Sequence, residues 1–335
     1  MKHLLFVFVG GVVVFLGGFL YTNTPANPSS DGIREVHILS GMKGSAIANL
    51  LYKENLIRSP FAFRVFSIAM RVNFRLQAGT YDLSPSMSTV EIIHMIEQGT
   101  IATETFTIRE GWGLEQIADM LVAKNLIPTQ EDWYNLVGKP RANGGVDFSQ
   151  TFSVLNHKPP EANLEGFLFP DTYTIPRYSS PEYILARILT RMQGKYEANI
   201  LSELGDRNLF EVLTIASLLE REVKTTDDKR IVAGIIQNRL QAGILLQIDA
   251  TIAYITGKTD FRTAPEDLRI DSAYNTYRYV GLPPGPIANP GMQSIWAALN
   301  HKDTPYFFYL STQEGKTIFS QTFEEHRKMI QEHLK

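Results

Sequence analysis

Carboxylates are the side chains of this 335-residue sequence that are best suited to do chemistry. The H-E-x-x-H metalloprotease motif, the G-x-S-x-G nucleophile motif and a phosphate-binding Gly-Lys-Ser/Thr loop are all absent, and there is no cysteine. The seven histidines are scattered, and we expect His326 and His333 to be surface residues. The sequence therefore predicts neither a metal nor a cofactor, and acid–base chemistry by carboxylates remains.

Glu220, in the stretch "LTIASLLEREV" (213–223), is the leading candidate. Ala216 and Ser217 lie one helical turn before it and are small, so we expect a groove above Glu220. Desolvation in a partly apolar groove would raise the pKa of this carboxyl and let it hold a proton at neutral pH, as a general acid for a glycosidic bond must. The alternative is a surface acid paired with Lys224 at i+4.

Three further segments carry aromatic and polar side chains of the kind that bind sugar rings. Aromatic faces stack on sugars, and amide and hydroxyl groups form hydrogen bonds with them. Turns favour the same residue types, so each segment alone is also consistent with a structural loop. The residues predicted to contact substrate are Glu165 and Asp171 in 163–176, Asn238, Gln247 and Asp249 in 238–254, and Tyr274, Asn275, Thr276 and Tyr277 in 273–291.

An internal repeat precedes these segments. Residues 36–57 and 106–127 align without gaps at an offset of 70, with eight identities in 22 positions, among them Gly41/Gly111 and the final Asn-Leu-Ile. Each copy begins with strand-like alternation, turns at the shared glycine and continues with apolar residues at helical spacing. The pattern resembles the LysM module, whose family binds the N-acetylglucosamine-containing glycans of cell walls. A unit that serves only for packing is the alternative.

The rest of the chain is predicted to be mostly helical. Between the two copies we expect a strand, an N-cap at Ser88 and a helix that ends at Gly99. Residues 139–160 are punctuated by Gly and Pro and suit a boundary loop. Helices are predicted over 181–204, 208–223, 228–242, 246–256, 291–300 and 322–334, with short strands at "PYFFYL" and "KTIFS".

The N-terminal sequence predicts a membrane anchor. Residues 4–21 contain no charge, and 18 residues at about 1.5 Å each would span roughly 27 Å, close to a bilayer core. Lys2 precedes the run and no Lys or Arg follows before Arg34, which favours a cytoplasmic N-terminus and an extracytoplasmic remainder in a single-pass protein of the plasma (inner) membrane. A cleaved signal peptide is the alternative, because "TPA" at 24–26 resembles a cleavage site. The net charge of -3 offers no basic stripe for nucleic acid.

Four segments in order resemble the YceG-like family of endolytic murein transglycosylases: "LEGFLFPDTY", "IASLLEREV", "NRLQAGILLQIDAT" and "AYNTYRYVGLPPGPIANPG". By this resemblance Glu220 is the catalytic glutamate and Glu222 completes its E-x-E motif. The resemblance implies a lyase that cleaves the MurNAc–GlcNAc bond of peptidoglycan and leaves 1,6-anhydro ends, so limiting strand length. The sequence departs from the family at Ala250, where proline is usual, and at Lys316-Thr317, where a histidine is common.

The expected architecture is α+β, with a transmembrane helix, a LysM-like module and a helix-rich transglycosylase domain. Peptidoglycan strands and the membrane are the expected partners; peptidoglycan synthases and the elongation or division machinery are compatible with this role. A hydrolytic muramidase and a non-catalytic wall-binding or scaffold protein remain as alternatives. The predicted boundaries are 1–22 (cytoplasmic tip and anchor), 23–32 (linker), 33–102 (LysM-like module), 103–138 (second strand–helix repeat) and 139–335 (catalytic domain).

Overall fold

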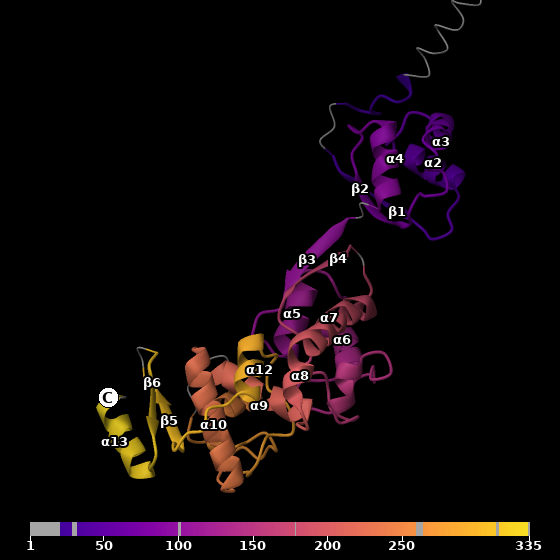
Figure 1. The fold of residues 1–335 in the computed structure, drawn as a ribbon. Helices are drawn as coiled ribbons and strands as arrows, with labels where there is room; N and C mark the ends of the chain where they lie inside the picture. The colour runs from indigo at the N-terminus through magenta and orange to yellow at the C-terminus, as the bar shows by residue number, and fades with distance from the viewer. Residues whose placement is uncertain are drawn as a thin grey trace, which may run out of the picture. The chain divides into compact units, whose positions relative to one another are not determined.

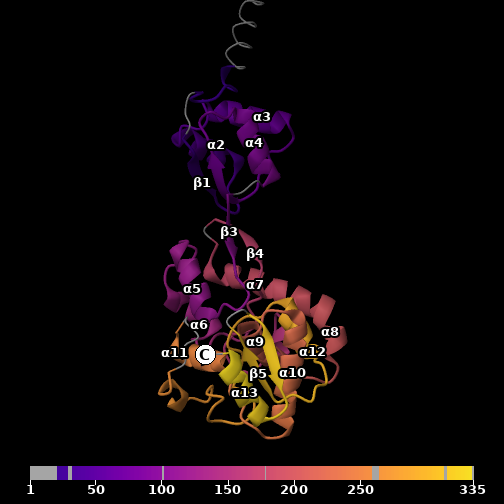
Figure 2. The same cartoon turned by 90° about the vertical axis from the view of Figure 1, so that its left-hand side faces the viewer.

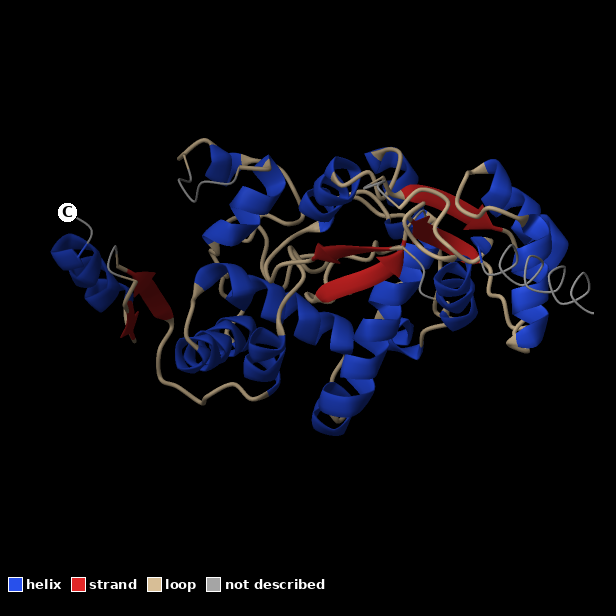
Figure 3. Ribbon diagram, turned by 90° about the horizontal axis from the view of Figure 1, so that it is seen from above, coloured by secondary structure: helices blue, strands red, loops and turns tan. Residues whose placement is uncertain are grey.

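The computed structural model describes residues 21–28, 32–99, 102–177, 179–258, 264–312 and 315–333. The chain forms two compact units, one of residues 1–105 with 174–179 and one of residues 106–173 with 180–335. Helices dominate and the strands are short, which confirms the predicted helix-rich α+β class (Figure 3). None of the helices in the described ranges is long and apolar enough to cross a membrane. The predicted anchor at 4–21 falls outside those ranges except for Tyr21.

The first unit is built on an antiparallel strand pair with helices packed against it (Figure 1). The strands pair from Arg34 opposite Leu83 to Ile38 opposite Gly79. Buried side chains from the strands and helices, including Tyr81, Leu51 and Phe63, form its core. Its elements are β1 (Arg34–Ile38), α2 (Gly44–Lys53), α3 (Pro60–Ala69), β2 (Gly79–Leu83) and α4 (Thr89–Gln98).

The chain before β1 is bonded to this unit. The backbone and side chain of Asn23 accept hydrogen bonds from Thr89 N–H (3.2 Å) and Val90 N–H (3.1 Å) at the start of α4. Asn27 N–H donates to the Pro85 carbonyl at 2.9 Å. The described residues 21–28 therefore differ from the free linker that their composition predicts, because polar linker side chains satisfy the first turn of α4.

The second unit carries most of the helices (Figures 1 and 2). The strands β3 and β4 pair with each other and are divided between the two units. Thr105 bonds Thr174 and Thr107 bonds Thr172, a register that makes this pair antiparallel. The elements from β3 onward are β3 (Thr103–Thr107), α5 (Leu114–Ala123), α6 (Gln130–Val137), η1 (Ser153–His157), β4 (Thr172–Pro176), α7 (Pro181–Lys195), η2 (Tyr196–Ile200), α8 (Leu201–Leu204), α9 (Leu209–Glu222), α10 (Thr226–Gln241), α11 (Asp249–Thr256), η3 (Asp267–Arg269), α12 (Met292–Leu299), β5 (Phe308–Ser311), β6 (Thr317–Ser320) and α13 (Phe323–His333).

The internal repeat is present in the structure and is longer than the sequence indicates. Helices α2 and α5 begin 70 residues apart, as do α3 and α6, so each copy is a strand, two helices and a closing strand. The turn after the first helix is the same in both, with Asn55 at φ 51° and Asn125 at φ 55°. The next N–H bonds back five residues in each copy, Leu56 to Leu51 and Leu126 to Leu121, both at 2.9 Å.

Most predicted elements are confirmed, including the N-cap Ser88, the C-cap Gly99 and the helices beyond residue 180. Besides the short 3-10 turns η1 and η3, three elements in the described ranges escape the sequence patterns: α3, α6 and β4. Helix α3 has only two polar side chains, Arg64 and Ser67, and so lacks a polar stretch that would mark it as a surface helix, while α6 is only eight residues long. Residues 172–176 read as an irregular segment, yet they form β4 because β3 supplies a partner. Residues 106–138, most of the predicted second strand–helix repeat, lie in the second unit together with the segment predicted as the catalytic domain.

Candidate active site

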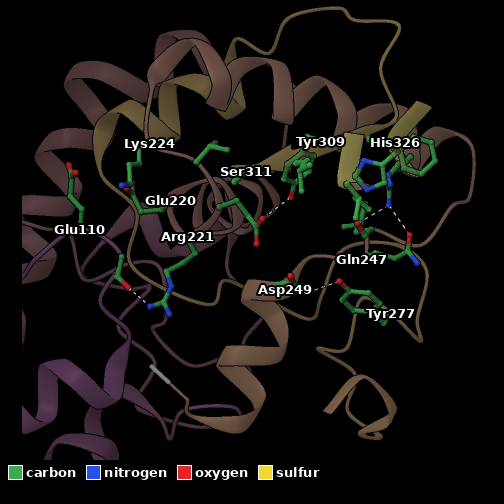
Figure 4. Close-up of a pocket in the computed structure, with 18 of the residues that line it drawn as sticks. Glu110, Glu220, Arg221, Lys224, Gln247, Asp249, Tyr277, Tyr309, Ser311 and His326 are labelled. Carbon is green, nitrogen blue, oxygen red and sulfur yellow. Dashed lines mark hydrogen bonds between the residues drawn. The ribbon is translucent and has the colours of Figure 1, made fainter. Parts of the chain in front are cut away.

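The second unit contains a cavity of about 950 Å³ beside the end of α9 (Figure 4). One wall is the loop between β3 and α5, with Glu110, Gly111 and Trp112. The other wall is formed by β5 and α13, and Figures 1 and 2 show β5 beside α10. Carboxylates, tyrosines and arginines line the space together, as suits a polar substrate with several hydroxyl groups.

Glu220 lies in the last turn of α9 and lines this pocket. Its Oε1 pairs with Lys229 Nζ of α10 at 3.1 Å, and both side chains are at most 9% exposed. Its Oε2 accepts hydrogen bonds from Gly291 N–H (2.9 Å) and Ser294 Oγ (2.7 Å), at the N-terminus of α12. The carboxylate is therefore fixed by three donors, and its ion-pair partner is Lys229 rather than the Lys224 of the surface alternative.

The groove predicted above Ala216 and Ser217 is absent. Both residues are fully buried, and Ser217 Oγ accepts a hydrogen bond from Ile287 N–H at 3.0 Å. The small side chains let the loop before α12 pack directly on α9, which closes the space that the sequence suggested. The open side of Glu220 faces the β3–α5 loop instead.

A second carboxyl, Glu110, lies beside Glu220. Gly291, whose N–H holds Glu220, is so near Glu110 that a methyl group built on it would come within 1.9 Å of Glu110 Oε1. Partial burial and the negative charge of Glu220 raise the pKa of Glu110, while Lys229 opposes the change. At a given pH, Glu110 therefore keeps its proton better than an ordinary glutamate does.

The loop that carries Glu110 is held by hydrogen bonds to Asn289 and to Arg221. Gly111 N–H donates to the Asn289 carbonyl at 2.9 Å, and Asn289 Nδ2 donates to the Trp112 carbonyl at 2.9 Å. Arg221 Nη1 donates to the Gly111 carbonyl at 3.1 Å. Gly111 has φ +76°, which favours glycine, and a side chain there would lie 3.6 Å from Glu220 Cγ.

Glu222 forms a separate acid–tyrosine cluster in the same pocket. It accepts hydrogen bonds from Tyr309 Oη at 2.9 Å and from Ala250 N–H at 3.1 Å, and burial raises its pKa. Tyr277 Oη donates to Asp249 Oδ1 at 2.6 Å nearby. The departure at Ala250 has a structural consequence, because a proline in this position could not donate to Glu222.

The C-terminal helix brings His326 to the pocket, where this residue, predicted to lie on the surface, is half-buried. The ring of His326 stacks on Phe308 with centroids 5.3 Å apart, and its Nδ1 is buried without a partner among the described residues. Burial and Arg239 lower the pKa of His326. At the position where the family commonly has a histidine, Thr317 Oγ1 bonds Asp228 at 3.0 Å.

Glu165 does not line the main pocket but binds the start of α5, the helix that follows the Glu110 loop. It is 1% exposed and accepts hydrogen bonds from Leu114 N–H (3.0 Å), Tyr254 Oη (3.3 Å) and Asn289 Nδ2 (3.3 Å). Burial raises its pKa to about 8, although the bonds from Leu114 and Tyr254 oppose this. Its carboxyl caps α5, the helix that follows the Glu110 loop, so its position argues for support of that loop rather than substrate contact.

Of the nine residues predicted to contact substrate, the structure brings Gln247, Asp249 and Tyr277 to the pocket with Glu220. The others have internal partners or are buried, so direct contact is not supported for them. Asp171 pairs with Arg191, Asn238 donates to the carbonyls of Thr304 and Tyr306, Tyr274 packs on Tyr254, Asn275 donates to the carbonyls of Leu268 and Ile270, and Thr276 bonds Thr251.

The sequence interpretation missed Glu110, Lys229 and Tyr309. The sequence contains a clue to Glu110: the repeat aligns it with Ser40, so the second copy has a carboxylate where the first has a neutral residue, next to the shared glycine. Lys229 and Tyr309 had none, since each meets its partner through tertiary packing of separate elements.

The second unit is thus a helix-rich α+β fold with two neighbouring carboxyls, Glu110 and Glu220, in one polar pocket. The chain belongs to the YceG-like family, whose pattern matches residues 36–332. A yceG-like protein of Listeria monocytogenes (lmo1499, described as putative) has a similar structure, with a TM-score of 0.59 at 31% identity, covering 90% of this chain and 100% of that one.

Two relatives carry the name endolytic murein transglycosylase. The protein of Bacillus subtilis (strain 168) is 33% identical over 332 residues, which cover 95% of this chain and 90% of the relative. The protein of Streptococcus pneumoniae (serotype 2, strain D39) is 30% identical over 338 residues, or 92% of this chain and 60% of the relative. Both likenesses extend over nearly the whole chain.

Proposed function

We propose that this protein is an endolytic murein transglycosylase, a lyase that cleaves the MurNAc–GlcNAc bond of nascent peptidoglycan strands and leaves 1,6-anhydroMurNAc ends. Family membership and the names of the relatives support the activity. The observation that carries the assignment to a site is Glu220, held by three donors at one end of a pocket of about 950 Å³.

Glu220 acts in both steps of the reaction. As an acid it gives its proton to the glycosidic oxygen while the bond from that oxygen to the muramoyl C1 breaks. As a carboxylate it then takes the proton of the C6 hydroxyl, whose oxygen bonds to C1 of the same sugar. The proton count closes without water, and the tethered hydroxyl has the high effective concentration of an intramolecular nucleophile.

The proton for the first step has a source within the site. In the structure Glu220 is paired with Lys229, so it must be protonated before it can act as an acid. Glu110 lies next to it and has a raised pKa. The proton taken from the C6 hydroxyl leaves Glu220 in its acid form at the end of each turnover, and Glu110 beside it favours retention of that proton by the pair of carboxyls.

Replacement of Glu220 by Gln tests the assignment. Glu220→Gln keeps the size of the side chain and its acceptor for Gly291 and Ser294, but it can neither give nor take the proton. We expect cleavage of purified glycan strands to fall by about 10³-fold or more with the fold intact. The control is Glu211→Gln, an exposed acid in the first turn of the same helix.

Mass spectrometry of the products separates the alternatives. Anhydro ends that disappear with Glu220→Gln support lysis by this residue. Reducing ends would show a hydrolytic muramidase with a second carboxylate placing water, and glycan binding without any product would show a wall-binding protein. Anhydro ends made at an unchanged rate by Glu220→Gln would contradict the site.

We further propose a single-pass anchor at residues 4–21, with the N-terminus cytoplasmic and both units extracytoplasmic. The uncharged run and the absence of Lys or Arg between it and Arg34 support this topology. Protease added to intact spheroplasts should digest the C-terminal units and spare an N-terminal tag. Digestion of the tag, or release of the protein without detergent, would contradict the anchor.

The first unit is proposed to be the LysM-like module, bounded by residues 33–102. Its order of strand, two helices and strand, with antiparallel β1 and β2, supports this. Glycan binding by this unit should survive Glu220→Gln, which separates binding from cleavage. Loss of all glycan binding in that variant would remove the support for a separate binding module.

A further inference from the structure

Helix α3 of the first unit exposes apolar side chains on the face that points away from the core. Its inner face is buried through Ala62, Phe63 and Ser67. On the outer face Phe61 is 66% and Ile68 is 60% exposed. These two residues and Arg64 share one side of the helix, since they are spaced at i, i+3 and i+7. Phe74, in the turn that follows, is 95% exposed.

The segment that contains this helix is basic. No Asp or Glu occurs between Asn55 and Tyr81, a stretch that contains four arginines. Arg75 pairs with Glu97, but no acid among the described residues pairs with Arg64 or Arg71. We call Phe61, Arg64, Ile68, Arg71 and Phe74 the α3 face. Apolar side chains interleaved with unpaired arginines fit the headgroup region of an anionic bilayer, where both are stabilised.

The second copy of the repeat shows that the fold does not require such a surface. At the offset of 70, Phe61 corresponds to Glu131, and Arg64 to Tyr134. Phe63 corresponds to Trp133, and both of these are fully buried. The inner positions are thus apolar in both copies, while the outer position Phe61 is apolar only in the first. Core packing explains the apolar inner positions, but it does not explain the exposed Phe61.

The chain enters the first unit at the start of α3. The guanidinium of Arg58 lies 4.6 Å from the centroid of the Tyr21 ring, and Arg58 directly precedes the N-cap Ser59. Tyr21 is also the last residue of the apolar run 4–21 that is proposed as the anchor. A helix of ten residues is about 15 Å long, so the α3 face lies close to the point where that run ends.

We propose that the α3 face docks on the anionic lipid headgroups of the membrane, with Phe61, Ile68 and Phe74 in the interfacial layer and Arg64 and Arg71 against lipid phosphates. This goes beyond cleavage and rests on the proposed anchor, which brings the face to the bilayer. The contact holds the α3 face of the first unit against the membrane surface, next to nascent glycan strands.

The chain has no cysteine, so single-cysteine labels report on chosen positions of the full-length protein. Phe61→Cys, Phe74→Cys and the matched control Glu131→Cys carry an environment-sensitive fluorophore, in vesicles of phosphatidylcholine with or without phosphatidylglycerol. We expect lipids spin-labelled at the headgroup to quench the first two probes at least about threefold more than the third, and only in the anionic vesicles. Arg64→Gln/Arg71→Gln should abolish the difference.

Other outcomes would overturn the docking. Equal quenching at positions 61 and 131 would place the face in solvent, and quenching without anionic lipid would remove the role of the arginines. A probe response that depends on protein concentration and persists without vesicles would show a second copy on the face instead. Flotation and glycan cleavage are measured on the same samples, so loss of the anchor or of the activity is seen separately from loss of docking.

Discussion

The two copies of the internal repeat share a backbone but differ at two places on it. In the first copy, a side chain on Gly41 in the turn after β1 would meet nothing within 4 Å among the described residues. In the second copy the equivalent turn is built into the active-site pocket, and a side chain on Gly111 would touch Glu220 and Arg221. One turn geometry therefore serves as plain surface in one copy and as a wall of the site in the other.

The N-termini of the first helix in each copy, α2 and α5, also differ. Helix α2 begins at Lys43 without a side-chain cap, whereas α5 receives the buried carboxyl of Glu165 at its first N–H. The outer faces differ in the opposite direction, since the first copy exposes Phe61 where the second has Glu131. The second copy is thus specialised at its loop for chemistry, and the first at its second helix for contact with a surface.

The largest expected effect comes from emptying the core of each copy. Phe63 and Trp133 occupy equivalent, fully buried positions, so Phe63→Ala and Trp133→Ala should each destabilise their unit by about 3–5 kcal/mol. Glycan cleavage should differ, because only the second copy positions the Glu110 loop. We expect turnover of soluble strands within about twofold of wild type for Phe63→Ala and a loss of about tenfold for Trp133→Ala.

Denaturant unfolding measured together with turnover provides the check, at a temperature where both variants remain folded. Equal losses of turnover in the two variants would break the comparison, since the first copy would then also hold the site.

The next effect concerns the residue that distinguishes the two turns. Glu110→Gln should slow cleavage by about tenfold to a hundredfold, whereas Ser40→Ala, at the equivalent position, should be silent. The pH–rate profile of Glu110→Gln should shift in a defined direction. Two neighbouring carboxyls repel as anions and keep their last proton to higher pH, so removal of one should move the alkaline limb to lower pH.

Gly291→Ala offers an independent test of the same contact. Gly291 has φ -76°, which alanine tolerates, but its new methyl group would overlap the Glu110 carboxyl. The combined variant Gly291→Ala/Glu110→Gln should then be little slower than Glu110→Gln alone. Additive losses would mean that Gly291→Ala acts on Glu220 and not through Glu110.

Local signals explain how much of the fold was predictable. The N-cap at Ser88, the C-cap at Gly99 and the helical spacing beyond residue 180 act within a few residues, so the sequence alone reveals them. Helix α3 is hard to recognise in the sequence because its outer face carries Phe61 and Ile68 beside a single charged residue, Arg64, so a continuous polar face is absent. That difficulty is itself informative, because the missing polar face is the surface proposed to meet the membrane.

Within the candidate site, the sequence predicts best the residue whose chemistry the reaction requires, the acid Glu220. Glu220 stood out, and the resemblance of four segments to a known family gave it a role. Asn275 and Thr276 were assigned to substrate because polar side chains in a loop suit a sugar, yet they satisfy buried backbone and hydroxyl groups. Polar residues that bind ligands and those that brace a loop look alike in sequence, and only packing separates them.

A smaller effect tests the support under the second copy. Glu165 has a pKa of about 8 in the folded protein against an ordinary 4.5, so the folded state binds the extra proton between these values. The free energy of unfolding should therefore fall as pH rises from about 5 to about 8, by at most about 1.4 kcal/mol per pH unit. Glu165→Gln should flatten this slope, and Glu115→Gln, an exposed acid in α5, the helix that Glu165 caps, should leave it unchanged.

The smallest expected effect is on the outer face of α3. Phe61→Ser should change the free energy of unfolding by no more than about 0.5 kcal/mol, because the side chain is already 66% exposed. The contrast with Phe63→Ala, two residues away, separates the face that builds the unit from the face proposed to meet lipid. Urea titration of the full chain without vesicles measures both. A loss above about 2 kcal/mol for Phe61→Ser would mean that Phe61 contributes to the core, and the comparison with Glu131 would then lose its force.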